Sequence, residues 1–206
     1  MKTALLLLSL IAAGTAGAET VLPALHDVSG VAANDVLNIR QEPAAASPII
    51  GQLAPGLTGV EVVGVSPDGK WGRVSTGEAS GWASMAFLDR QSRPNWFTLE
   101  VGLSCSGTEP FWSLNIDRLQ KTAQFTTPDG QGPQMDITTQ WRGDVWRQVA
   151  AIQFAGGADQ GFATIRAEAC SDGMSDRDFG LRTDVFLQGT PSSPARALRG
   201  CCSLVP

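Results

Sequence analysis

The stretch Cys170-Ser-Asp-Gly-Met-Ser-Asp-Arg177 directly follows an alternating run of small and apolar residues. The run consists of Ala163, Ile165, Ala167 and Ala169. Every second residue of a strand points to the same face of a sheet, so this spacing predicts a strand that ends at the cysteine. Ser, Asp and Gly favour turns. We therefore predict a strand that runs into an anchored turn.

All four cysteines lie in the second half of the chain, at Cys105, Cys170, Cys201 and Cys202. A bond between the adjacent pair is disfavoured, because neighbouring Cα atoms are about 3.8 Å apart and disulfides need ~4.4–6.8 Å. On a strand these two side chains point to opposite faces. One is therefore expected to bond Cys105 and the other Cys170, and the sequence leaves open which. The spacing is not that of a metal site, so we predict no metal.

The rest of the second half also alternates, and it predicts an antiparallel sheet closed into a small barrel or packed as a sandwich. Strands are expected at residues 97–103, 112–116, 135–141, 185–187 and 195–201. The polar segment at residues 91–96 predicts a linker, so this disulfide-stapled β domain is expected to cover residues 97–206. With 23 glycines, 12 prolines and no long helical pattern, we predict an all-β protein.

The N-terminus is typical of a secretory signal peptide over residues 1–18, with Lys2, an apolar run of about ten residues and an Ala-Gly-Ala cleavage site. The apolar run is shorter than the ~20 residues of a membrane span. We therefore expect a periplasmic or secreted protein with no transmembrane anchor after cleavage. Cleavage leaves 14 basic and 20 acidic residues, a net charge of −6 that disfavours nucleic acid as a partner.

The first half predicts a small barrel of five short strands over residues 28–90. Val60-Glu-Val-Val-Gly-Val65 and Trp71-Gly-Arg-Val74 place apolar residues near period two, and Pro67-Asp-Gly69 between them is a hairpin turn. Several motifs follow the bacterial SH3 (SH3b) pattern in order, namely Leu37-Asn-Ile-Arg40, Pro55-Gly56, Gly69-Lys-Trp71 and Gly81-Trp82 leading to Leu88. The region thus resembles that family, which implies an SH3-like barrel that binds peptidoglycan or a peptide.

Four residues of this domain are candidates for ligand binding: Asn38, Arg40, Trp71 and Trp82. The two tryptophans are suited to stacking on a ligand, but they also suit the core or the rim of so small a barrel. The amide of Asn38 equally suits a backbone hydrogen bond, and Arg40 equally suits a surface cation packed beside aromatic rings.

The second half resembles a family of uncharacterised bacterial envelope proteins through three blocks in order. These are Cys105-Ser-Gly-Thr-Glu-Pro-Phe-Trp112, Cys170-Ser-Asp-Gly-Met-Ser-Asp-Arg177 and Gly200-Cys201-Cys202. Where that family has an aromatic-proline pair after the Asp-Arg, this chain has Asp178-Phe179-Gly180. The resemblance implies a location in the envelope and a fold, but no mechanism.

Catalysis by an activated Ser or Cys is disfavoured. The single histidine, His26, is expected before the first strand, and the cysteines are expected to be bonded. A carboxylate-dependent hydrolase of envelope glycan remains the alternative function, with Glu109, Asp172, Asp176 and Asp178 as its acids. The same acids suit turn hydrogen bonds and an Asp176–Arg177 ion pair, and the aspartates do not have EF-hand spacing for calcium. We predict no cofactor.

The leading hypothesis is a non-enzymatic binding or scaffold protein of the bacterial cell envelope. Its first domain is expected to bind peptidoglycan or peptide, and its second to contact a possible envelope protein partner. The disulfides are expected to bring Glu109, Trp112, Asp172 and Arg177 together as a second candidate binding surface. The alternative for this surface is a purely structural network, in which Asp172 and Arg177 form a buried pair.

Overall fold

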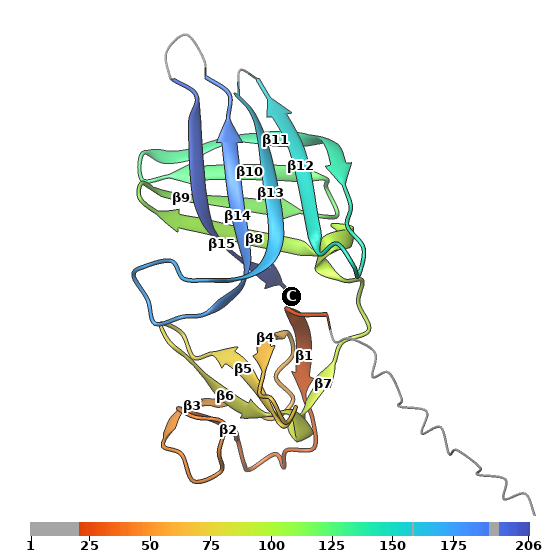
Figure 1. Cartoon of the computed structure of the whole chain (residues 1–206), viewed down its shortest axis with the longest axis vertical. Helices are drawn as coiled ribbons and strands as arrows, with labels where there is room; N and C mark the ends of the chain where they lie inside the picture. The colour runs from red at the N-terminus through yellow and green to blue at the C-terminus, as the bar shows by residue number, and fades with distance from the viewer. Residues whose placement is uncertain (1–20, 158, 190–193) are drawn as a thin grey trace, which may run out of the picture.

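A computed structural model describes residues 21–157, 159–189 and 194–206. The chain is all-β, as predicted, and forms a seven-stranded sheet followed by a closed eight-stranded barrel (Figure 1). The expected signal peptide at residues 1–18 lies outside the described residues. Within the described ranges, no helix has the length and apolar character needed to cross a membrane.

The first sheet has the strand order β3-β2-β6-β5-β4-β1-β7. Its strands are β1 (Ala24–Val28), β2 (Leu37–Arg40), β3 (Ile49–Leu53), β4 (Val60–Val65), β5 (Trp71–Ser75), β6 (Ser80–Ser84) and β7 (Leu88–Arg90), with the short 3-10 helix η1 (Met85–Phe87) before β7. The predicted hairpin is β4 paired with β5. Alternation places Val62 and Val74 opposite each other and buries both.

The sheet contains two strands more than predicted, β1 and β7. Strand β1 pairs with β4 on one side and with β7 on the other. It therefore carries His26, which was wrongly expected to precede the first strand. The imidazole is buried, and burial lowers its pKa. The sequence of β1 does not alternate clearly because both of its faces are covered, so its period-two signal is weak.

The barrel closes in the order β10-β11-β12-β13-β14-β15-β8-β9. Its strands are β8 (Gly102–Thr108), β9 (Phe111–Asp117), β10 (Thr122–Thr127), β11 (Gly130–Trp141), β12 (Val149–Gly156), β13 (Asp159–Cys170), β14 (Phe179–Leu187) and β15 (Arg196–Val205). Side chains of alternate residues fill the interior, including Leu103, Leu114, Ile152 and Leu181. Of the two predicted architectures, the structure shows the barrel.

The strand predicted at residues 97–103 is largely wrong. The 3-10 helix η2 (Trp96–Thr98) occupies its first part, Leu99 has a left-handed φ of 58°, and β8 begins only at Gly102. The apolar residues Phe97, Leu99 and Val101 are all buried in the barrel core cluster. The predicted burial of every second residue was therefore correct, but the predicted strand was not. A turn that covers the end of a barrel can bury alternate residues as well.

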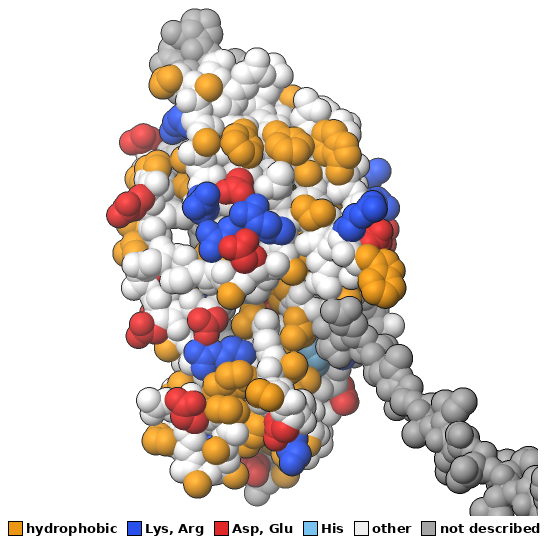
Figure 2. Space-filling view, in the orientation of Figure 1, with side chains coloured by type: hydrophobic (Ala, Val, Ile, Leu, Met, Phe, Trp, Pro, Cys, Tyr) orange, Lys and Arg blue, Asp and Glu red, His pale blue; other side chains and the backbone are white. Residues whose placement is uncertain are grey.

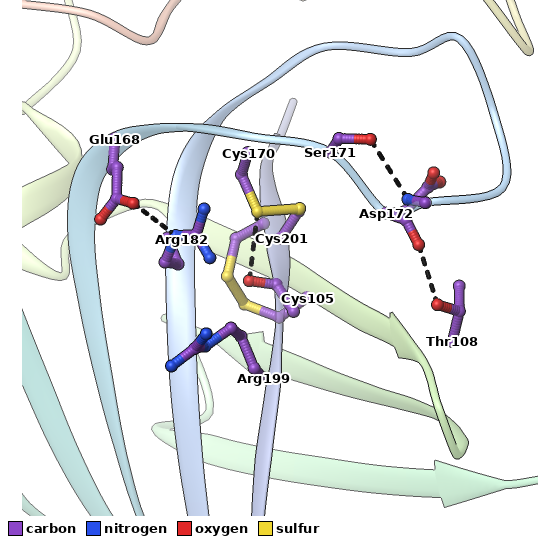
Figure 3. Close-up of a disulfide and its surroundings, with 12 residues drawn as sticks. Cys105, Thr108, Glu168, Cys170, Ser171, Asp172, Arg182, Arg199 and Cys201 are labelled. Atoms are coloured by element: carbon purple, nitrogen blue, oxygen red, sulfur yellow. Dashed lines mark hydrogen bonds and ion pairs between the residues drawn. A yellow bond between two sulfur atoms is a disulfide. The ribbon is translucent and has the colours of Figure 1, made fainter.

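The disulfides join Cys105 to Cys202 and Cys170 to Cys201 (Figure 3). As predicted, the adjacent cysteines point to opposite faces of β15. Cys202 lies in the barrel core with Cys105, whereas Cys201 packs with Cys170 and Phe179 in a separate cluster. The Cα atoms of Cys170 and Cys201 are 5.7 Å apart, within the expected range, but those of Cys105 and Cys202 are only 3.9 Å apart because they are direct cross-strand neighbours.

Candidate functional site

A short backbone pairing joins the two domains, and we call it the interdomain clasp (residues 78–80 with 176–178). Ala79 and Asp176 form a parallel bridge. The Ser80 N–H donates to the Asp176 carbonyl at 3.2 Å, and the Asp176 N–H donates to the Glu78 carbonyl at 2.9 Å. The Asp178 N–H donates to the Ser80 hydroxyl at 2.8 Å. The turn after Cys170 thus adds to the first sheet, and Figure 1 shows it reaching down from the barrel.

An ion pair lies beside the clasp. The Arg73 guanidinium contacts the Asp178 carboxylate at 2.6 Å, and the same guanidinium lies 5.3 Å from the centre of the Trp82 ring. Arg73 and Trp82 are cross-strand partners on β5 and β6, so the sheet itself sets their contact. The Asp178 carboxylate of the second domain therefore orients the Arg73 guanidinium, which covers the Trp82 indole ring of the first domain.

The domains also meet around β4 and the C-terminal strand. The Leu204 N–H donates to Glu61 Oε1 at 2.9 Å. On the side of β1, Trp96 Nε1 donates to the Leu22 carbonyl at 3.3 Å, and Trp96 packs in the barrel core cluster. Contacts at several separated places restrict rotation of one domain against the other.

A cleft of about 1310 Å³ opens between the two domains. Ile50, Val63 and Trp82 of the first sheet contribute apolar lining, as does Phe179 of the barrel. Charged residues line it too: Arg73, Glu42, Glu168, Asp176 and Asp178. An apolar lining with a few fixed polar groups is the usual composition of a binding site, and this cleft is larger than the ~300–1,000 Å³ typical of small-ligand pockets.

Of the four candidates in the first domain, only Trp82 lines this cleft. Trp71 is half-buried on β5 and does not line it. Arg40 Nη1 donates to the Ser47 carbonyl at 2.7 Å, which ties down the loop between β2 and β3. Asn38 is half-buried opposite Gln52 on β3. The structure therefore separates the two tryptophans, which the sequence could not distinguish.

The expected meeting of Glu109, Trp112, Asp172 and Arg177 is found only in part. A groove of about 380 Å³ is lined by Trp112 and Asp172, but not by Glu109, which is exposed, or by Arg177. The Trp112 indole is buried inside the barrel and stacks on Phe125 with ring centres 5.9 Å apart. Trp112 is thus mainly a core residue.

No Asp172–Arg177 or Asp176–Arg177 ion pair occurs in the described part of the chain. The Asp172 carboxylate accepts hydrogen bonds from the N–H groups of Met174 and Ser175 and from the Ser175 hydroxyl. Burial would raise the pKa of Asp172, but these hydrogen bonds outweigh it and hold the pKa below its usual range. The carboxylate therefore closes its own turn.

Arg177 has different partners from those expected. Its Nη2 donates to the Ser203 hydroxyl at 2.9 Å, and its guanidinium lies 4.6 Å from the centre of the Phe179 ring. Among the described residues, no three His, Cys, Asp or Glu side chains gather as a metal ion would require. Instead, Asp172 closes the turn, Asp176 forms the bridge of the interdomain clasp and Asp178 pairs with Arg73.

The sequence interpretation missed Arg73 and Ile50, and it considered Asp178 only as a possible catalytic acid. Arg73 lies two residues after Trp71, so the sequence placed both on the same face of a strand but gave Arg73 no partner. Its partners come from the neighbouring strand and from a turn 105 residues away in the sequence. A contact so distant leaves no local signal in one sequence.

The first sheet, with its short strands, tight turns and core of small aliphatic residues, defines an SH3-like domain. Residues 35–89 match the family model described as bacterial SH3 domain. No curated protein and no solved structure matches the chain. The match covers the strands that carry Trp71 and Trp82, and it does not extend to the barrel, whose resemblance to envelope proteins stays a hypothesis.

Proposed function

We propose that this chain is an exported, non-enzymatic binding protein of the bacterial cell envelope, and that its SH3 domain binds peptidoglycan or a peptide in the interdomain cleft. The observation that carries the proposal is the position of Trp82, which lines the cleft and is covered by a guanidinium that Asp178 orients. A bacterial SH3 domain is a binding module, and this one has its candidate stacking residue in the interdomain cleft.

The size and lining of the cleft support a polymer segment as the ligand. Its apolar lining suits side chains or the apolar faces of sugar rings, and its charged lining residues suit amide and hydroxyl groups. Ile50, on the edge strand β3, extends this lining towards solvent.

The disulfides support both the location and the mode of binding. Two disulfides suit the periplasm or the exterior, which agrees with the signal peptide expected at residues 1–18. The Cys170–Cys201 bond also fixes the start of the turn that carries Asp176 and Asp178. Groups held in place before binding lose little entropy when a ligand arrives. We propose that the barrel supports the cleft in this way and that it also contacts an envelope protein partner.

The test is sedimentation of residues 19–206 with purified peptidoglycan sacculi. Ile50→Glu introduces a charge into the cleft lining without removing a core side chain, and we expect it to abolish most of the binding. Ile49→Glu is the matched control, because Ile49 is the exposed neighbour that does not line the cleft. Equal sedimentation of the two variants would exclude the cleft as the site.

Trp82→Ala adds a second comparison. We expect it to weaken binding by about tenfold or more, as for other buried aromatic anchors. Trp71→Ala is its control, since both tryptophans are half-buried in the same sheet and only Trp82 lines the cleft. Melting curves of both variants show whether each remains folded.

The glycan hydrolase alternative gains no support from the geometry. Asp172 closes its turn and Asp178 pairs with Arg73, so both carboxylates have structural partners. Glu109 lines neither the cleft nor the groove beside Trp112. We expect no sugar release from sacculi, and release that Glu109→Gln and Asp172→Asn abolish would contradict this expectation.

A further inference from the structure

A second surface lies on the outer face of the barrel, and we call it the aromatic strip (Trp141, Phe162 and Phe186). Phe162 on β13 is the cross-strand partner of Phe186 on β14. The rings of Trp141 and Phe162 are 5.4 Å apart and meet edge to face. Figure 2 shows a row of hydrophobic side chains across this face of the barrel.

The strip offers two rings to solvent. Trp141 and Phe186 are each 48% exposed, whereas Phe162 between them is half-buried. The edge-to-face contact holds the indole ring of Trp141 in place. Phe162 and Phe186 lie on adjacent strands, which are ~4.8 Å apart, and Trp141 reaches Phe162 across β12, so the three rings follow one another at a spacing comparable to that of sugar residues in an extended glycan. Exposed aromatic rings of this kind mark interaction sites more often than isolated apolar residues do.

An arginine cluster (Arg166, Arg182 and Arg199) lies beside the strip on the same face. Asp184 contacts Arg166 at 2.7 Å and Arg199 at 3.2 Å, and Glu168 contacts Arg166 at 2.8 Å and Arg182 at 2.7 Å. Three cations therefore face two carboxylates. The surface has a local charge of +1 in a chain whose net charge is −5.

Arg199 is the cation most available to a ligand. Its side chain is 70% exposed, compared with 36% for Arg166 and 23% for Arg182. It lies two residues along β15 from Ala197, which is the cross-strand partner of Phe186. Two residues along a strand span ~6.6 Å, so the guanidinium and the Phe186 ring stand on the same face at neighbouring positions.

We propose that the aromatic strip and the arginine cluster bind an acidic polysaccharide. The apolar faces of its sugar rings would pack on Trp141 and Phe186, and a carboxylate of the same chain would pair with Arg199. The charge of the cluster is complementary to such a polymer and opposite to that of the protein as a whole. Because Glu168 also lines the interdomain cleft, the outer face of β13 runs continuously from the strip to the cleft. The proposal does not depend on what the cleft binds.

The test measures binding of residues 19–206 to polygalacturonate by calorimetry, with the fully methyl-esterified polymer as the uncharged control. We expect Trp141→Ala and Phe186→Ala each to weaken binding by roughly two- to tenfold, the range for loss of one aromatic contact. Arg199→Gln should weaken binding to the acidic polymer by about threefold at low salt and less at high salt. It should leave the weak binding of the ester unchanged.

Trp146→Ala is the matched control, because Trp146 is 86% exposed and lies outside the strip in the turn between β11 and β12. Trp82→Ala separates this surface from the cleft. The proposal would be overturned if Trp146→Ala weakened binding as much as the strip variants do. It would also be overturned if only Trp82→Ala weakened binding. Tight binding to anionic lipid vesicles but not to the polymer, or a dimer in sedimentation that Trp141→Ala dissociates, would overturn it as well.

Discussion

Glu61 should make the stability of this protein depend on pH between about 4.5 and 7. Its carboxylate is on β4, where Oε1 accepts the Leu204 N–H at the domain boundary. Burial raises the pKa of Glu61 from its ordinary 4.5 to about 7, although hydrogen bonds from Leu204 and Ser203 and the charge of Arg177 act in the opposite direction. Desolvation of the carboxylate is therefore the larger effect.

The sign follows from proton binding. Between pH 4.5 and about 7, the folded protein keeps a proton on Glu61 that the unfolded chain has already released. The free energy of unfolding is therefore highest below pH 4.5, and it decreases as the pH rises through 7. A change from 4.5 to about 7 corresponds to about 3 kcal/mol. Solvent reaches part of this half-buried residue and screens its charge. We therefore expect a measurable loss of ~1–3 kcal/mol.

The assay is urea unfolding of wild type and Glu61→Gln at pH 5 and pH 8. The variant cannot ionise, but its amide oxygen can still accept the Leu204 N–H. Its stability relative to wild type should rise by ~1–3 kcal/mol between the two pH values. Burial lowers the pKa of His26, which also makes stability depend on pH, and the comparison with wild type cancels that contribution. The exposed Glu109→Gln should track wild type, and a constant difference between Glu61→Gln and wild type at both pH values would refute the reasoning.

Two further stability predictions concern the second domain. Replacing Cys170 and Cys201 by Ser should cost about 3.7 kcal/mol, and replacing Cys105 and Cys202 about 4.7 kcal/mol, because the loops they close span 31 and 97 residues. Chemical denaturation of the non-reduced proteins measures both losses, and the reverse order would contradict the loop-entropy account. Asp172→Ala should cost only about 1–2 kcal/mol, since it removes turn hydrogen bonds and not a buried ion pair. A loss of 4 kcal/mol or more would show that Asp172 has a charged partner.

The sequence predicted best where neighbours along the chain determine the structure. The hairpin of β4 and β5 follows from a turn motif between two alternating runs, and it was found as expected. That Cys201 and Cys202 point to opposite faces of the sheet follows from strand geometry alone. Which cysteine bonds Cys170 depends on the register between β14, β15 and β8, and that register is set by packing across the barrel.

The prediction failed where polar residues had several possible partners. Asp172 and Arg177 are five residues apart, and their opposite charges suggested a pair. In the structure each has nearer partners, because a carboxylate that follows a strand can accept the N–H groups of its own turn at little cost in entropy. Arg177 instead reaches Ser203, whose position depends on β15 crossing beside the turn. Local hydrogen bonds therefore prevailed over a charge pair inferred from the sequence.

The cleft could not be predicted from either domain separately, and this affects how its function should be tested. Trp82 belongs to the first sheet, whereas Asp178, which orients the guanidinium above it, follows the Cys170–Cys201 disulfide. An isolated SH3 domain would retain Trp82 and Arg73 but lose the carboxylate and half of the cleft lining. If the ligand binds between the domains, the isolated domain should bind more weakly than the whole chain, and Asp178→Asn should reproduce part of that loss. If the SH3 domain binds alone, Asp178→Asn should leave the affinity unchanged.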